Sequence, residues 1–353
     1  MQLNFRRYDL KLAHNWMVAS SQATGGKMIY PAVLLELRAN DGTIGYGEAA
    51  PSMRYLENAQ TCLDFLGKID AGRLSFDDLE GSMRYVESVS AGDFSPKGAL
   101  NIALLDGAAK IARKPLYEFL QLGFAEAKHV TSVSIGIDTP EIMRQKTLDA
   151  APFPHLKMKV GSPNDMKNLA AIREAAPQKT IRVDANEAWP TKEEALRNIE
   201  AFARDPHIEF IEQPIPAANP PEDFIWLKER SPLPIIGDES YLNAADAGRC
   251  AQCFHGINVK LAKTGGMTRA IEALRVARAA GLKTMIGSMV ESSLLTSAGA
   301  HLASLADWLD LDGRLLITND PFRGVTSERG VMSFADASEP FGLRVTPVAF
   351  ASP

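Results

Sequence analysis

Polar side chains that can carry out chemistry recur at nearly even intervals between residues 157 and 312. Counted from Lys159, the series consists of Lys159, Asp184, Glu212, Asp238, Lys260, Ser288 and Asp310. Each ends a short apolar run, and successive members lie 22 to 28 residues apart. One strand, one helix and two turns fill about that length in a β/α repeat. We therefore expect these residues at the carboxyl ends of consecutive parallel strands, where barrel enzymes carry their active sites.

Three carboxylates come in succession within this series: Asp184, Glu212 and Asp238. Acids that converge on one side of a barrel mouth repel each other unless a cation lies between them. All-oxygen ligation of this kind suits magnesium or manganese. Asn186 and Glu239 each lie just beyond one of these acids and are expected to orient them. The alternative is that the three acids are ion-paired or lie on the surface.

Lysines flank the three acids on both sides, with Lys159 on the predicted second strand and Lys260 on the sixth. In a closed barrel these strands lie on opposite sides of the mouth. Lys157 shares the inward face of its strand with Lys159, because side chains two residues apart point the same way. Nearby positive charge is expected to lower the lysine pKa values towards neutrality, which makes a neutral amine available as a base. The pattern predicts proton abstraction beside a carbonyl, with a metal stabilising the enolate. Structural ion-paired lysines are the alternative.

Alternating strand and helix patterns surround these residues. The first strand is expected over 130–137, and seven more end near residues 160, 184, 212, 238, 260, 287 and 311. Thr139-Pro140 is typical of a helix start, with a capping hydroxyl followed by proline at the first position. Eight strands that alternate with helices predict an α/β fold with a closed parallel barrel.

The N-terminal part has a different pattern. Residues 1–50 predict antiparallel strands with a hairpin turn at Asn40-Asp41-Gly42, and helical periodicity follows from about 57 to 122. Ser20–Lys27 is small, polar and glycine-rich and predicts a mobile loop, and a second loop is expected at Pro51–Tyr55. The expected division is an α+β capping domain over 1–126, the barrel over 127–318, and a tail over 319–353 that returns to the capping domain.

Composition narrows the class of partner. The chain has 353 residues, a net charge of −5 and 46% apolar residues, so we expect a globular protein that does not bind nucleic acid. Three cysteines argue against a disulfide framework, and no apolar run reaches signal-peptide or membrane-spanning length. The expected location is the cytoplasm, without membrane contact. Assembly into a homo-oligomer is left open.

The same lysines and acids, at these spacings, resemble the enolase superfamily in its muconate-lactonising branch. The resemblance covers essentially the whole chain and implies a (β/α)7β TIM-like barrel beneath an α+β capping domain. It implies one Mg²⁺ per active site on Asp184, Glu212 and Asp238, acid/base roles for Lys159 and Lys260, and neutralisation of the substrate oxyanion by Lys157. The mandelate-racemase branch is disfavoured because its seventh-strand histidine is absent from 287–291.

The end of the barrel sequence narrows the resemblance. Asp310-Leu311-Asp312, together with Gly287-Ser288-Met289, resembles the dipeptide epimerases of the L-Ala-D/L-Glu type. The resemblance implies that Asp310 and Asp312 hold the amino terminus of a dipeptide. It also implies substrate contacts at Ser134, Ser288 and Met289. An acidic rim is the alternative for the two aspartates.

One expected residue is missing, because an arginine that contacts the glutamyl side chain in the family has no match in residues 20–27. Lys27 or Arg54 is a candidate replacement, and either is equally consistent with a solvated loop charge. The identity of the second residue of the dipeptide is therefore left open.

Taken with these residues, the resemblance implies a magnesium-dependent epimerase that inverts the α-carbon of the second residue of a small-molecule dipeptide. Two lysines would carry out a 1,1-proton transfer through an enolate. Alternatives within the branch are o-succinylbenzoate synthase, N-acylamino acid racemase and a cycloisomerase. A non-catalytic ligand-binding barrel is the alternative from another class.

Overall fold

Eight parallel strands form the central sheet of the computed structural model, which describes residues 1–348. They are β5 (Val133–Ile135), β6 (His155–Lys159), β7 (Thr180–Asp184), β8 (Ile208–Glu212), β9 (Ile235–Gly237), β10 (Gly256–Lys260), β11 (Lys283–Gly287) and β12 (Trp308–Asp310). Neighbours in this order are hydrogen-bonded, and a parallel bridge from Thr131 to Leu309 joins the first strand region to the last. The predicted barrel is confirmed.

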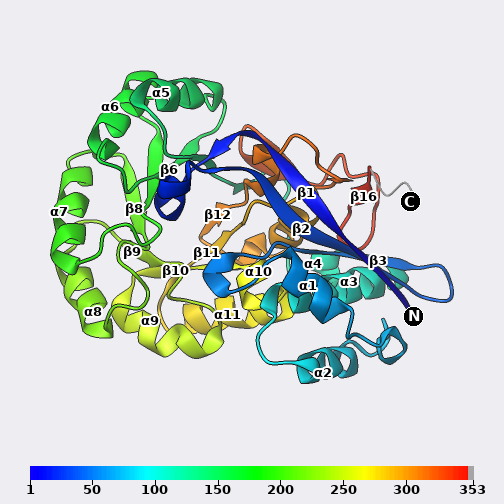
Figure 1. The fold of residues 1–353 in the computed structure, drawn as a ribbon. Helices are drawn as coiled ribbons and strands as arrows, with labels where there is room; N and C mark the ends of the chain where they lie inside the picture. The colour runs from blue at the N-terminus through cyan, green and yellow to red at the C-terminus, as the bar shows by residue number, and fades with distance from the viewer. Residues whose placement is uncertain (349–353) are drawn as a thin grey trace.

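Helices cover the outside of the barrel, and those within residues 140–253 form an arc on the left of Figure 1. The helices that cover the barrel are α5 (Pro140–Asp149), α6 (Asp165–Ala175), α7 (Lys192–Phe202), α8 (Pro221–Arg230), α9 (Ala247–Cys253), α11 (Met267–Ala279) and α12 (Ser293–Ala300). The predicted start of α5 is confirmed, since the Thr139 side chain caps the helix and Pro140 is its first residue. The outer faces of the strands carry apolar side chains, which pack against these helices and are buried by them.

The barrel interior is filled by side chains that precede the residues at the strand ends by two positions. Phe210 and Ile236 are fully buried and cluster with Met285. Beside Phe210, its register partner, Arg182 donates from its guanidinium Nε to Glu209 at 2.7 Å. This packed layer closes the barrel below the acids, so the polar ends of the strands open only towards the mouth.

The N-terminal elements form the capping domain on the right of Figure 1. Strands β1 (Gln2–Trp16), β2 (Lys27–Arg38) and β3 (Ile44–Ala49) make an antiparallel sheet, as predicted. Helices α1 (Ala59–Leu66), α2 (Leu79–Val89), α3 (Phe94–Ile111) and α4 (Leu116–Phe119) follow. Helix α3 lies so close to β3 that a Cβ on Gly47 would come within 2.1 Å of the Ala99 carbonyl oxygen. Glycine at this position is therefore required by the packing.

The segment from Ser20 to Lys27 differs from the mobile loop that its composition predicts. Residues Ala19–Thr24 form a 3-10 helix, η1, in which Ser21 is buried. The Gln22 side chain donates to the carbonyl oxygen of Gly161 at 2.8 Å. The segment is therefore held against the barrel by a hydrogen bond that local composition does not reveal.

Short strands tie the last described residues to the rest of the chain. Strands β14 (Thr326–Glu328) and β15 (Val331–Ser333) form a sheet with β4 (His129–Val130), and β13 (Phe322–Arg323) pairs with β16 (Thr346–Pro347). The predicted strand over 130–137 is thus divided between two sheets, because β4 pairs with the tail and β5 with the barrel. Among residues 1–348, no helix combines the length and apolar character needed to cross a membrane.

Candidate active site

A cavity of about 510 Å³ lies at the carboxyl ends of the strands, between the barrel and the capping domain. Most of the site residues predicted from the sequence line it: Lys27, Arg54, Ser134, Lys157, Lys159, Asn186, Glu239, Lys260, Ser288, Met289, Asp310 and Asp312. The capping domain adds aromatic walls from Trp16, Tyr30 and Tyr55, which the sequence pattern did not single out. The structure therefore brings the predicted chemistry into one enclosed space.

Lys159 and Lys260 approach this cavity from opposite sides. They end β6 and β10, which are four strands apart in an eight-stranded barrel. Lys159 Nζ lies 2.6 Å from Asp184 Oδ2, and Lys260 Nζ lies 2.7 Å from Asp238 Oδ2. Both lysines retain slight exposure, 7% and 8%, and line the cavity. A flat group held between them would have one amine on each face.

Lys157 is enclosed more completely than the two flanking lysines. Its Nζ lies 3.0 Å from Asp184 Oδ2, 2.8 Å from Glu212 Oε2 and 2.5 Å from Asp310 Oδ2. Burial lowers the pKa of Lys157, but the three carboxylates outweigh it and raise that pKa well above its ordinary value. Lys157 is therefore a fixed positive charge at the base of the cavity.

The pKa of Lys260 differs in direction from the sequence-based expectation. Burial lowers it, but the adjacent Asp238 carboxylate raises it well above the ordinary value. The expectation of a pKa near neutrality counted the neighbouring cations and left out the direct ion pair. The carboxylate partner, rather than the other lysines, dominates the electrostatics in this arrangement.

The three acids Asp184, Glu212 and Asp238 lie beneath the cavity on adjacent strands, and all are fully buried. Within residues 1–348 no group of three or more His, Cys, Asp or Glu side chains converges closely enough to form a metal site in this structure, and a lysine ammonium group contacts each of the three acids. Two nearby buried oxygens, Asn186 Oδ1 and Glu239 Oε2, have no hydrogen-bond partner among the described residues. The donor set is all oxygen and under-satisfied, which fits a hard divalent cation such as Mg²⁺.

Two carboxyl groups in this region have raised pKa values, and neighbouring acids contribute to both. Burial, followed by repulsion from Asp184, raises the pKa of Glu212 to about 7. Burial, followed by repulsion from Asp238, raises the pKa of Glu239 to about 8. A bound cation at this place would relieve the repulsion among the acids.

Two further residues hold the acids in place, and the sequence reading missed both. Gln213 has a positive φ of 36°, and its Oε1 accepts from the backbone N–H of Asp238 at 2.9 Å. Lys263 Nζ lies 2.5 Å from Asp238 Oδ1 and is buried. Their positions in the sequence could have indicated this role, because Gln213 follows Glu212 directly and Lys263 comes about one helical turn after Lys260.

Asp310 has a cationic partner within the barrel, namely Lys157. It ends β12, and its oxygens accept from Lys157 Nζ and, at 2.8 Å, from Ser132 Oγ. These partners lie 153 and 178 residues earlier in the chain, so local spacing could not reveal them. Asp310 is therefore already neutralised within the barrel.

Asp312 is the aspartate of this pair that lacks a lysine partner among the described residues. It lies just past β12, before the 3-10 helix η6 (Gly313–Leu316), and accepts from the Ser134 backbone N–H at 2.6 Å. Ser288 Oγ lies 3.5 Å from its other oxygen. Burial, followed by repulsion from Asp310, raises the pKa of Asp312 to about 6. Asp312 is thus the acid best placed to receive a positive charge from the cavity.

The two lid candidates have different surroundings. Arg54 forms a two-pronged ion pair with Glu187, with Nε and Nη2 at 2.6 and 2.8 Å from its carboxylate oxygens. The pair fastens the capping loop to the barrel loop after β7. Lys27 is exposed, lines the cavity and has no ion-pair partner within residues 1–348. Lys27 therefore retains a charge that a substrate could use.

Comparison with known proteins places the chain in a family. The family model for the enolase C-terminal domain-like family matches residues 141–316. An L-Ala-D/L-amino acid epimerase from Pedosphaera parvula is 58% identical over 98% of this chain and 99% of its own. An L-Ala-D/L-Glu epimerase from Bacteroides thetaiotaomicron is 36% identical over 95% of this chain and 86% of its own.

The solved structures agree with this placement. A dipeptide epimerase from Enterococcus faecalis, in complex with Mg and the dipeptide L-Leu-L-Tyr, superposes with a TM-score of 0.87. It is 29% identical, and the match covers 98% of this chain and 99% of that chain. Sequence identity, coverage and fold all point the same way. The chain belongs to the enolase superfamily, among its dipeptide epimerases.

Proposed function

We propose that the protein is a magnesium-dependent dipeptide epimerase that inverts the α-carbon of the second residue by a two-lysine 1,1-proton transfer. The observation that carries this proposal is the placement of Lys159 and Lys260 on opposite sides of one cavity. Inversion requires that a proton leaves one face of a carbon and another returns to the opposite face. Two amines on opposite sides can divide these tasks between them.

The remaining polar groups would stabilise the enolate formed between the two proton transfers. Lys157, held charged by three carboxylates, places a fixed cation next to the developing oxyanion. Asp184, Glu212 and Asp238 would hold Mg²⁺, which when bound supplies further positive charge to the oxyanion. Asn186 and Glu239 would orient these acids from the cavity side, and Asn186 Nδ2 donates to Glu239 Oε1 at 3.3 Å.

The substrate would be oriented by its two ends. Asp312 would accept the free ammonium group of the first residue, with Ser288, Met289 and the Ser134 backbone forming the adjacent wall. Lys27 would pair with an acidic side chain on the second residue. The names of the relatives, which include epimerases for L-Ala-D/L-Glu and for L-Ala-D/L-amino acids, support a first residue as small as alanine.

We also propose a division of the chain into domains and a cellular compartment. We place the capping domain at 1–126, the barrel at 127–318 and the tail at 319–353. The three cysteines of the described structure are free and buried, which is compatible with the cytoplasm as the compartment.

Proton NMR of a dipeptide library in deuterated water with Mg²⁺ tests the function. Loss of the α-proton signal of the second residue, together with appearance of the other epimer, is the expected result. New unsaturation without epimerisation would instead identify a lyase, such as an o-succinylbenzoate synthase, or a cycloisomerase. Preference for N-acylated amino acids would identify an N-acylamino acid racemase. No change in any compound would contradict the proposal.

A further inference from the structure

The capping domain is in direct contact with the turn that follows Lys260. Lys260 is the residue before the short helix α10 (Leu261–Thr264), and two left-handed glycines, Gly265 and Gly266, separate α10 from α11. Helix α3 rests on this turn, and a Cβ on Gly98 would come within 2.8 Å of the Gly266 backbone nitrogen. A side chain larger than hydrogen at residue 98 would collide with the turn, so α3 and the turn are in close backbone contact.

One side chain of α3 also completes the start of α11. The residue before α11 is Gly266, which has no side chain that could cap the helix. Instead, Asn101 Oδ1 accepts from the Thr268 backbone N–H at 3.1 Å, and Asn101 Nδ2 donates to Thr268 Oγ1 at 2.8 Å. Asn101 is buried and lies 167 residues earlier in the chain. It performs across the domain interface the task of a helix-capping residue.

The turn is held from the barrel side as well. Lys263, on α10, reaches under the site and contacts Asp238 Oδ1, while Lys260 contacts Asp238 Oδ2. The segment 260–268 is therefore fixed at one end to an acid of the active site and at the other to Asn101. The turn therefore connects the Asn101 contact to the end of β10, which carries Lys260.

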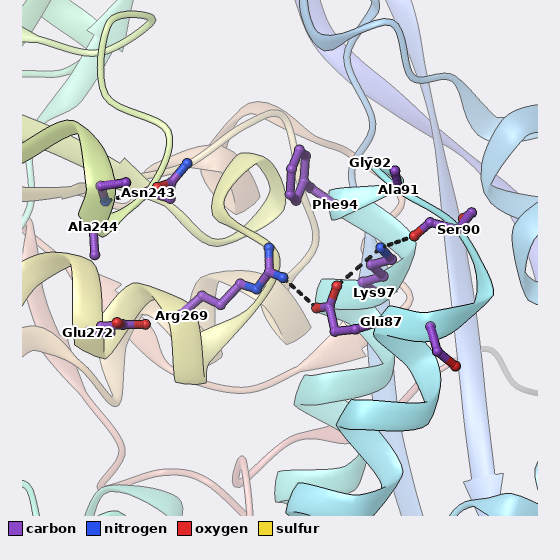
Figure 2. Close-up of a pocket in the computed structure, with 12 residues that line it drawn as sticks. Glu87, Ser90, Ala91, Gly92, Phe94, Lys97, Asn243, Ala244, Arg269 and Glu272 are labelled. Carbon is purple, nitrogen blue, oxygen red and sulfur yellow. Dashed lines mark hydrogen bonds and ion pairs between the residues drawn. The ribbon is translucent and has the colours of Figure 1, made fainter.

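A second contact lies at the edge of the same interface, beside a pocket shown in Figure 2. Arg269 Nη2 lies 2.8 Å from one oxygen of Glu87, and Lys97 Nζ lies 3.1 Å from the other. Arg269 and Glu87 are each about a third exposed, so this bridge is expected to contribute little to the position of the turn. It offers a matched control in the same interface.

We infer that Asn101 is a positioning residue for Lys260, through which the capping domain sets the reach of one of the two bases. The inference rests on the proposed function, because it assigns Lys260 to one face of the substrate. Lys159, on the far side of the barrel, is in a different segment and has no contact with Asn101 in the described structure. Loss of the Asn101 contact should therefore damage proton transfer on one face more than on the other.

Four variants separate this role from general destabilisation. Asn101→Leu keeps the number of side-chain heavy atoms and the branching at Cγ, and it removes both hydrogen bonds. Asn101→Asp keeps an acceptor for the Thr268 N–H and accepts from its hydroxyl, so it should restore function. Thr268→Val removes only the hydroxyl contact and should have an intermediate effect. Glu87→Gln weakens the bridge at the pocket and leaves Asn101 unchanged.

The first readout is exchange of the α-proton in deuterated water, measured separately from L-Ala-L-Glu and L-Ala-D-Glu. Asn101→Leu should slow exchange from one epimer about tenfold or more and from the other by less than about threefold, since small misplacements of a base are costly. The affected epimer should be the one whose exchange Lys260→Ala abolishes. Equal slowing of both epimers, or an equal change in the ratio with Glu87→Gln, would overturn the inference.

The second readout is backbone amide exchange over residues 261–270 in the full chain, which needs no turnover. Faster exchange in Asn101→Leu, restored in Asn101→Asp, is the expected result, and unchanged exchange in Asn101→Leu would overturn the inference. If the unmodified protein exchanges neither α-proton, the proposed function has failed. The amide exchange then decides by itself whether Asn101 holds the turn.

Discussion

Lys157 and Asp310 form a buried ion pair at the base of the active-site cavity, with Nζ and Oδ2 2.5 Å apart. The pair joins β6 to β12 across the strand region that closes the barrel. It gives Asp310 a partner within the protein, whereas Asp312 has no lysine partner among the described residues. The two aspartates of the Asp310-Leu311-Asp312 sequence therefore have different tasks.

Asp312→Asn should lower kcat/KM for a free dipeptide by about tenfold to a hundredfold. The reason is loss of a charge-assisted hydrogen bond to the substrate ammonium, which contributes roughly 1.5–3 kcal/mol. An N-acetylated dipeptide lacks that ammonium and should be a poor substrate for the unmodified enzyme. The measurement is kcat/KM for both dipeptides with both enzymes, and the penalty for acetylation should shrink in the variant.

Asp310→Asn is the matched comparison. It leaves Lys157 with one carboxylate fewer, so it should impair turnover of free and acetylated dipeptides by similar factors. A larger change in the acetylation penalty with Asp310→Asn than with Asp312→Asn would contradict this division of roles. Equal turnover of free and acetylated dipeptides by the unmodified enzyme would rule out an ammonium site.

Removal of magnesium should abolish activity, and Asp238→Asn should weaken both metal binding and activity strongly. Asp238 is fully buried between Lys260 and Lys263, so the variant loses a metal ligand and a partner of two lysines. The measurement is activity against added Mg²⁺ after exhaustive chelation. Asp77→Asn, at an exposed acid of the capping domain, is the control. Full activity after chelation would contradict the metal requirement.

The sequence predicted the barrel and the positions at which its chemistry would lie. The even spacing and the types of the polar residues were enough for this prediction, because Lys159, Asp184, Glu212 and Lys260 are each the last residue of a strand. A strand end in a parallel barrel has a defined place relative to its neighbours. The interval between strands therefore carries three-dimensional information.

Pairing across the barrel could not be predicted in the same way. The contact of Lys157 with Asp310 spans 153 residues, and that of Arg54 with Glu187 spans 133. Charge and spacing along the chain do not indicate with which of several acids a given lysine or arginine forms an ion pair. For the same reason the raised pKa of Lys260 and the folded segment at Ala19–Thr24 became evident only in the structure.

Glu48→Gln should change how stability depends on pH. Glu48 is buried and accepts from the backbone N–H of Ser292 at 2.9 Å, and burial raises its pKa to about 7. The folded protein thus holds this proton more tightly than the unfolded chain, whose carboxyl has a pKa of about 4.5. The contribution favours folding at low pH and is lost as pH rises towards 7. It amounts to at most about 3 kcal/mol.

The measurement for Glu48 is the free energy of unfolding between pH 4.5 and 8 for both proteins. Relative to the variant, the unmodified protein should lose stability as pH rises through this range. Two curves that run parallel would contradict the assignment.

Lys27→Met should reduce selectivity for an acidic second residue. Lys27 is exposed, lines the cavity and has no ion-pair partner within the described residues. Loss of an exposed ion pair is expected to cost roughly 0.2–1 kcal/mol, so kcat/KM for L-Ala-Glu should fall by up to about fivefold. The value of kcat/KM for L-Ala-Met should stay the same or rise. Arg54→Met is the comparison, and a larger loss of acidic selectivity there would reassign the role.

The most direct test of the central claim is α-proton exchange by Lys159→Ala and Lys260→Ala in deuterated water, starting from each pure epimer. Each variant should fail to interconvert the epimers. Each should still exchange the α-proton of one epimer, and the two variants should keep exchange of opposite epimers, because each remaining lysine serves one face. Interconversion near the unmodified rate in either variant, or retention of the same epimer's exchange in both, would contradict the two-lysine account.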